Sequence, residues 1–260
     1  MEGKRYSLAI NNGPNHLHGG IVGFDRLMWA AESRESAEEC SVRFQVVSPD
    51  GQEGYPGELQ VSALYRWNND NELTYQFEAT TSAATVINMT NHSYWNLGGE
   101  KSGLILDHEV KMFCNKYLAV DDTLIPTGEF ATAAGTPLDF HDYRRLGDRI
   151  QELTATKGYD HCFVVNGEAG KQPRPCGLAR DPNSGRVMEV LTTQPGVQLY
   201  TGNFLDGIAG KNGRRYSQFG ALCLEAQVHP DAIHHDHFPD TVLKHCQTYQ
   251  QKTVYKFCVS

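Results

Sequence analysis

The feature that most constrains the fold of this chain is a series of short runs of alternating or β-branched residues, separated by Gly, Pro, Asn and Asp. Such runs predict β-strands, and their repetition with little helical periodicity predicts an all-β protein, a large antiparallel β-sandwich. The predicted strands are residues 6–10, 42–47, 59–67, 73–80, 85–89, 109–113, 187–192, 197–200, 222–226 and 253–259.

The segments between these runs predict two tight hairpins and two short connecting helices. Residues 68–71 (NNDN) and 181–185 (DPNSG) supply side chains that tolerate left-handed backbone and bond to their own main chain. Short helices are predicted over residues 144–153 and 33–40, neither of which has a long apolar stripe. We find no internal repeat and no Pro/Ser-rich linker, so we predict a single domain that spans residues 1–260.

Charge and cysteine usage narrow the class of protein. The net charge of -8 repels nucleic acid and anionic lipid, so neither is an expected partner. No apolar run approaches the ~20 residues of a membrane helix, and the first residues contain no apolar signal core. The seven cysteines form no Cys-x-x-Cys pair, which favours reduced thiols. We therefore expect a monomeric protein of the cytoplasm that does not bind a membrane.

Residues 90–99 (TNHSYWNLGG) are the first candidate for a functional site. Polar and aromatic residues alternate here at the end of an apolar run, and two glycines follow. His92 can donate or accept a proton near neutral pH, and Tyr94 and Trp95 can form the flat walls on which sugars stack. Taken alone, a histidine in such a run is more often a buried structural residue that bonds to the backbone.

Residues 222–227 (LCLEAQ) place one carboxylate inside an otherwise apolar strand. Burial raises the pKa of a carboxylate unless hydrogen-bond donors compensate, and a raised pKa makes Glu225 a better base at neutral pH. The alternative is that Glu225 is an ordinary outward-facing residue of a half-exposed strand. Three more polar clusters that contain glycine, residues 15–20, 158–161 and 194–203, suit a pocket that binds sugar hydroxyls.

The sequences of these segments, and their order along the chain, resemble the aldose 1-epimerase (galactose mutarotase) family, particularly its animal members. The likeness covers nearly the whole chain. The matching segments are residues 14–20 (PNHLHGG), 23–25 (GFD), 48–57 (SPDGQEGYPG), 90–99, 124–129 (LIPTGE), 158–161 (GYDH), 193–207 and 224–231.

The resemblance implies the family's fold, chemistry and site residues. The fold is the large antiparallel β-sandwich known as the galactose mutarotase-like supersandwich, and no metal or cofactor is needed. His92 becomes the general acid and Glu225 the general base of an isomerase that interconverts the α- and β-anomers of D-galactose and D-glucose. His18, Asp160 and Gln198 are expected to bind sugar hydroxyls, and Tyr94 lines the same pocket. A neighbouring imidazolium is expected to offset the desolvation of the Glu225 carboxylate.

The N-terminus departs from the family pattern. Family members begin with additional strands that carry an Asn-Arg pair, and the present sequence starts after them. This departure leaves open a sugar-binding protein of impaired catalysis. A hexose-6-phosphate 1-epimerase on the same fold is a further alternative.

A His-rich segment at residues 229–237 suggests a different hypothesis, because such a composition can bind zinc or nickel. Its spacing matches no standard zinc pattern, and the resemblance implies a surface loop there.

Overall fold

The computed structural model describes Met1 and residues 3–260, which fold as two compact units. The first unit comprises Met1–Met89 and Asp231–Lys252, and the second comprises Thr90–Pro230 and Thr253–Ser260. Strands dominate both units, and they pair antiparallel, as β2 does with β3 and β10 with β13. The predicted all-β, antiparallel class is therefore confirmed, whereas the predicted single domain stays a prediction.

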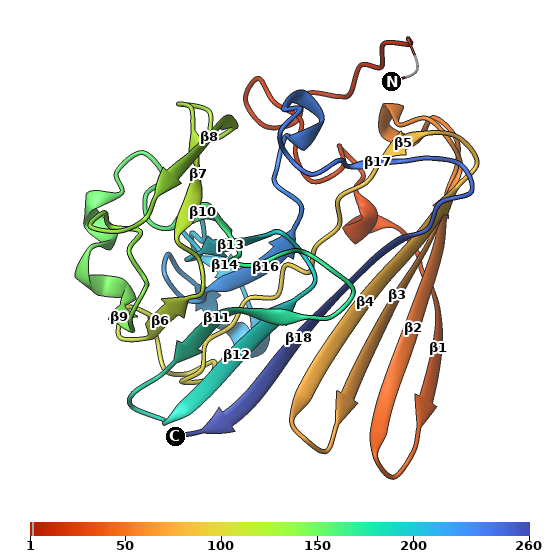
Figure 1. Ribbon diagram of the computed structural model, residues 1–260. Coiled ribbons are helices and arrows are strands. Elements are labelled where there is room, and N and C mark those ends of the chain that lie inside the picture. The colour runs from red at the N-terminus through yellow and green to blue at the C-terminus, as the bar shows by residue number, and fades with distance from the viewer. Residues whose placement is uncertain (2) are drawn as a thin grey trace. The chain divides into compact units, whose positions relative to one another are not determined.

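The first unit is a sheet of consecutive hairpins in the order β1-β2-β3-β4, with β18 next to β4 (Figure 1). Its elements are η1 (Phe24–Arg26), β1 (Ala30–Glu35), β2 (Glu39–Ser48), η2 (Gln52–Gly54), β3 (Leu59–Asn68), β4 (Glu72–Thr81), β5 (Thr85–Val86), η6 (Ala232–His234), β17 (Val242–Leu243) and the beginning of β18 (Tyr249–Val259). Val61 on β3 lies opposite Ala79 on β4, and both are buried. Alternation thus directs one face of β3 and β4 to a core completed by Ile87 and Leu243.

The second unit contains two larger sheets. One has the order β16-β13-β10-β7-β8, and the other runs from the end of β18 through β12, β11 and β6 to β9. Its elements are β6 (Glu109–Met112), β7 (Lys116–Val120), β8 (Pro126–Thr132), β9 (Arg144–Arg145), η3 (Leu146–Asp148), η4 (Ile150–Glu152), β10 (Asp160–Val164), β11 (Arg174–Arg180), β12 (Arg186–Thr192), β13 (Gly196–Tyr200), β14 (Ile208–Ala209), η5 (Lys211–Gly213), β15 (Arg215–Tyr216) and β16 (Cys223–Gln227).

These two sheets of the second unit pack face to face, as expected of a sandwich. The fully buried Tyr255 of β18 donates a hydrogen bond of 2.9 Å from its hydroxyl to the backbone oxygen of Leu224 in β16. Phe163 of β10 and Leu199 of β13 are also fully buried. Little of β10, β13 and β16 reaches solvent, so the polar residues within these strands, such as Gln198 and Glu225, are partly or fully buried.

Residues 33–40 do not form the predicted helix. They contain the end of β1, a turn and the beginning of β2, and Ser33 pairs with Val42. The Ser36 hydroxyl accepts hydrogen bonds from the backbone N–H groups of Glu38 (3.2 Å) and Glu39 (3.1 Å). Such local bonds offer the backbone an alternative to a helix, which explains why the prediction is wrong.

The other predicted helix, residues 144–153, is also wrong as a continuous element. It begins as strand β9, in which Arg144 pairs with Val110 of β6, and continues as two separate 3-10 turns, η3 and η4. Pairing with β6 outweighs the weak helical pattern of this segment. Residues 6–10, predicted as a strand, lie in irregular backbone. None of the helices in the described residues is long and apolar enough to cross a membrane.

Candidate active site

Three neighbouring strands of the second unit present a set of polar and aromatic side chains on one face. Gln198 of β13 lies opposite both Glu225 of β16 and Cys162 of β10, and Tyr200 lies opposite Cys223. Residues that face each other, and residues two apart on one strand, share a face of the sheet. Six of the side chains on this face are, strand by strand, Asp160 and Cys162, Gln198 and Tyr200, and Cys223 and Glu225.

Glu225 is a carboxylate in the interior of β16, with only 9% of its side chain exposed. Burial, with a further contribution from the neighbouring Asp160 carboxylate, raises the pKa of Glu225 to about 8. Both causes raise this pKa, so it does not return to the ordinary range that an offsetting imidazolium was expected to restore. A carboxyl group that titrates near neutral pH can accept a proton and also return it.

His92 reaches Glu225 because its segment docks on the free edge of β16. Trp95 and Leu222 form an isolated antiparallel bridge, with N–H···O bonds of 2.8 and 2.9 Å in the two directions. This bridge holds the segment that carries His92 against the edge of the sheet beside β16. The structure places His92 Nε2 3.7 Å from Glu225 Oε1, and 34% of the histidine side chain is exposed.

Aromatic rings enclose the imidazole of His92. The Tyr94 ring stacks on the imidazole, with the ring centroids 4.9 Å apart and an interplanar angle of 18°. The Tyr200 ring meets the imidazole edge-on, with the centroids 6.0 Å apart. Phe204 stacks in turn on Tyr200 at 6.4 Å. Tyr94 and Phe204 are exposed, so each offers a flat apolar surface beside the acid–base pair. Such surfaces suit the apolar faces of a sugar ring.

Asp160 and Gln198 are bonded to each other on the same face. The Gln198 amide donates a hydrogen bond of 2.7 Å from Nε2 to Asp160 Oδ1. This bond fixes the orientation of the amide, and its buried oxygen Oε1 has no hydrogen-bond partner among the described residues. A buried acceptor without a donor is unfavourable, so a ligand hydroxyl that donates to Oε1 would be stabilised here.

The polar residues around this face also have structural roles. The Asn203 amide donates hydrogen bonds of 2.9 Å to the backbone oxygens of Thr156 and Tyr159, and its oxygen accepts one of 2.6 Å from Thr201. Gly158 has a φ of 139°, and a Cβ there would lie 2.4 Å from Asn203 Oδ1. Part of the polarity predicted for a sugar pocket therefore holds together the loops that precede β10 and follow β13.

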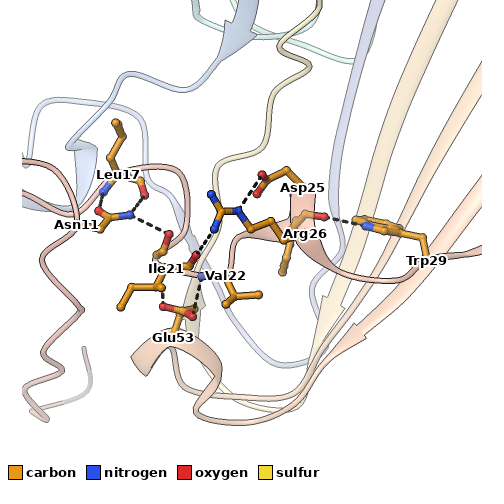
Figure 2. Close-up of polar contacts among 10 residues, drawn as sticks. Asn11, Leu17, Ile21, Val22, Asp25, Arg26, Trp29 and Glu53 are labelled. Carbon is orange, nitrogen blue, oxygen red and sulfur yellow. Dashed lines mark hydrogen bonds and ion pairs between the residues drawn. The ribbon is translucent and has the colours of Figure 1, made fainter. Parts of the chain in front are cut away.

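His18 belongs to the first unit, on an exposed loop, and has a φ of 54°. Figure 2 shows how this loop is held: the Asn11 amide donates to the backbone oxygens of Leu17 and Gly20, at 2.9 and 2.8 Å. Glu53 accepts hydrogen bonds from the backbone N–H groups of Ile21 (2.9 Å) and Val22 (3.0 Å). The conformation of the loop is thus fixed on both sides of His18, whose role in sugar binding stays a prediction.

Sequence reasoning missed Cys223 and Tyr200. The signal was present, because Cys223 precedes Glu225 by two residues in a predicted strand and must share its face. The Cys223 sulfur, a His92 ring nitrogen and a Glu225 oxygen all lie within 4.8 Å of one another. Burial raises the pKa of the Cys223 thiol well above its ordinary value, and the Glu225 and Asp160 carboxylates add to this effect.

The His-rich segment is divided between the two units. His229 is buried in the second unit, contrary to the expected surface position. In the first unit, Asp231 bonds to His234 Nδ1 at 2.6 Å and lies 3.6 Å from His235 Nε2. Among the described residues, this segment does not gather three metal-binding atoms, so the zinc alternative for it finds no support.

The chain is similar in sequence and in structure to known proteins. The sequence profile of a family described as aldose 1-epimerase matches residues 1–256. The galactose mutarotases of Bos taurus and Homo sapiens are 47% and 46% identical to the chain, over 100% of its length and 74% of theirs. The crystal structure of an aldose epimerase homologue from C. elegans superimposes with a TM-score of 0.89 at 32% identity, over 100% of this chain and 77% of that one. The chain belongs to the aldose 1-epimerase family.

Proposed function

We propose that this chain is an aldose 1-epimerase that interconverts the α- and β-anomers of D-galactose and D-glucose. The observation that carries the proposal is the pair of His92 Nε2 and Glu225 Oε1, 3.7 Å apart. Ring opening of an aldopyranose requires a base at the C1 hydroxyl and an acid at the ring oxygen O5. The similarity to proteins named galactose mutarotase supports galactose as a substrate.

In the proposed reaction, Glu225 takes the proton of the C1 hydroxyl while the His92 imidazolium gives a proton to O5. The C1–O5 bond breaks, its electron pair goes to O5, and C1 becomes an aldehyde. Rotation about the C1–C2 bond then presents the other face of the aldehyde to the O5 hydroxyl. In ring closure His92 removes the O5 proton and Glu225 returns a proton to the carbonyl oxygen, which restores both groups.

The raised pKa of Glu225, about 8, suits this exchange. An imidazolium beside a carboxylate holds the same number of protons as a neutral imidazole beside a carboxylic acid. The reaction alternates between these two states, and an ordinary imidazole titrates near 6.5. A carboxylate of ordinary pKa would favour the first state strongly, so its protonation during ring opening would be costly. Raising the pKa of Glu225 lowers the free energy of the second state relative to the first, so protonation of the carboxylate during ring opening costs less.

Sugar recognition is assigned to side chains on the same face and to His18. Gln198 Oε1 would accept a hydrogen bond from a sugar hydroxyl, and the Asp160 carboxylate that orients Gln198 would accept another. The exposed ring of Tyr94 would cover an apolar face of the sugar. None of the six side chains named on this face of β10, β13 and β16 is basic, which favours a free hexose over a hexose 6-phosphate.

The test is polarimetry on freshly dissolved α-D-galactose and α-D-glucose, with the corresponding 6-phosphates alongside. We expect the free sugars to equilibrate faster than in buffer and Glu225→Gln to lose this acceleration. Glu189→Gln is the matched control, because Glu189 is also a strand residue but lies on β12. Faster equilibration of the phosphates alone would overturn the proposal. Binding of galactose in calorimetry without any acceleration would identify a sugar-binding protein instead.

The role of His18 is tested through the loop that carries it. Glu53→Ala removes the acceptor for two backbone N–H groups beside His18. If His18 binds a sugar hydroxyl, this variant and His18→Ala should both raise the KM for galactose, with a smaller effect on kcat. An unchanged KM in His18→Ala would remove this residue from the site.

We further propose that the protein acts as a monomer in the cytoplasm and on small-molecule sugars alone. The net charge of -8 disfavours nucleic acid as a partner. Light scattering on the purified chain measures the molecular mass in solution. A mass that corresponds to a dimer would overturn the monomeric assignment.

A further inference from the structure

The second unit brings together three side chains whose atoms are good metal ligands. A His92 ring nitrogen, the Cys223 sulfur and a Glu225 oxygen all lie within 4.8 Å of one another. Glu225 and Cys223 are buried on one face of β16, and His92 comes from the segment bridged to the edge of that strand. The site is therefore built from a regular strand and a hydrogen-bonded bridge, and both fix backbone positions before any ion binds.

The donor set selects a particular class of cation. Sulfur, imidazole nitrogen and carboxylate oxygen together match the preferences of Zn²⁺, which in open sites takes three protein ligands and leaves a fourth position free. Hard cations such as Mg²⁺ and Ca²⁺ prefer all-oxygen surroundings. Ligand atoms around tetrahedral zinc lie about 3.3–3.6 Å apart, given the usual bond lengths of about 2.0–2.3 Å. His92 Nε2 and Glu225 Oε1 already lie 3.7 Å apart.

Local charge also favours a cation. A Cys223 thiolate and the Glu225 carboxylate would together neutralise a divalent ion. The Asp160 carboxylate acts electrostatically on both residues, so the surroundings carry additional negative charge. The six side chains named on this face include no basic residue, and His92 must be uncharged before it binds an ion.

We propose that His92, Cys223 and Glu225 form a zinc-binding site, and that zinc bound there excludes the sugar and inhibits the enzyme. On binding, the Cys223 thiol releases its proton to solvent and its sulfur donates an electron pair to the ion. The His92 ring nitrogen and a Glu225 oxygen donate the other two pairs. These are the pairs that the proposed reaction uses to accept protons, so the inhibitory half of the inference rests on the proposed function.

The binding half is tested by titrating the whole chain with Co²⁺ as a spectroscopic substitute for zinc. A thiolate ligand gives a sulfur-to-cobalt charge-transfer absorption, which we expect in the parent chain and not in Cys223→Ser. Cys162→Ser is the matched control, because Cys162 is a buried thiol on the same face but lies outside the three-residue cluster. Removing a ligand should weaken zinc binding by about 100-fold or more. Cys223→Ala gives the same readout if the serine variant folds poorly.

The inhibitory half is tested by polarimetry with and without Zn²⁺, and each variant is compared with its own zinc-free rate. We expect zinc to slow equilibration of galactose anomers in competition with the sugar, EDTA to restore the rate, and Cys223→Ser to lose at least 10-fold in sensitivity. Equal sensitivity in Cys223→Ser, or no charge-transfer absorption in the parent, would overturn the zinc site. Absorption without inhibition would support the zinc site and count against the proposed catalytic roles of His92 and Glu225.

Discussion

Glu225 should destabilise the folded protein at the pH where it is proposed to act. Burial, with a smaller contribution from the Asp160 carboxylate, raises its pKa from 4.5 to about 8. Between these two values the folded protein holds a proton that the unfolded chain has released, so stability is lost as the pH rises through this window. Each pKa unit corresponds to about 1.4 kcal/mol, so the whole window represents about 5 kcal/mol. Glutamine at position 225 has a similar shape and does not titrate.

The prediction follows from this difference. The free energy of unfolding of Glu225→Gln, relative to the parent chain, should increase by about 3–4 kcal/mol between pH 5 and pH 8. Urea unfolding at the two pH values, followed by tryptophan fluorescence, measures this change. Groups that do not interact with position 225 titrate alike in both proteins and cancel in the comparison.

The matched control is Glu189→Gln, for which no such pH-dependent gain is expected. If the difference in free energy of unfolding between Glu225→Gln and the parent stays constant from pH 5 to pH 8, the reasoning is refuted. That result would mean that Glu225 titrates near its ordinary value in the folded protein. A gap that widens as predicted would show that the enzyme gives up stability for a base of suitable strength.

Three more predictions concern the site and its support. His92→Asn and Glu225→Gln should each slow galactose equilibration by about 10²–10⁴-fold, and the double variant should lose far less than the product, as polarimetry will measure. Burial lowers the pKa of His161 to about 4, so the free energy of unfolding decreases as the pH falls from about 6.5 towards 4. In His161→Asn this decrease should be smaller by up to about 3 kcal/mol, as urea unfolding at the two pH values will measure. Gly158→Ala places a Cβ 2.4 Å from a buried amide oxygen and should lower the melting temperature clearly, whereas Gly170→Ala, with open space around it, should not.

The strands that could be predicted are those whose side chains alternate or are mostly apolar. Residues 59–67, 187–192 and 222–226 correspond closely to β3, β12 and β16. β1 was missed because all of its residues are exposed, so its polar sequence carries no alternation. β11 was missed because it contains Pro175 and Gly177, between which the pairing with β12 shifts register.

The site could be predicted only in part, because its residues lie far apart in the sequence and are brought together by strand pairing. Glu225 stood out as a charge within an apolar strand, and Cys223 shares its face by alternation alone. That Gln198 faces Glu225 required the pairing of β13 with β16, which no local pattern specifies. The resemblance to a family supplied the roles of these residues, but the pKa of Glu225 depends on burial and on Asp160, which only the fold brings close.

The bridge between Trp95 and Leu222 explains how two distant segments form one acid–base pair. β16 is the edge strand of its sheet, and an unpaired edge offers backbone groups to another segment. Trp95 uses two of them, and its ring is anchored against Tyr255 at 5.2 Å. The bridge holds the segment that carries His92 beside β16, and His92 Nε2 lies 3.7 Å from Glu225 Oε1. Backbone pairing at Trp95 thus helps to keep the imidazole beside the carboxylate, where both groups can exchange protons with a substrate.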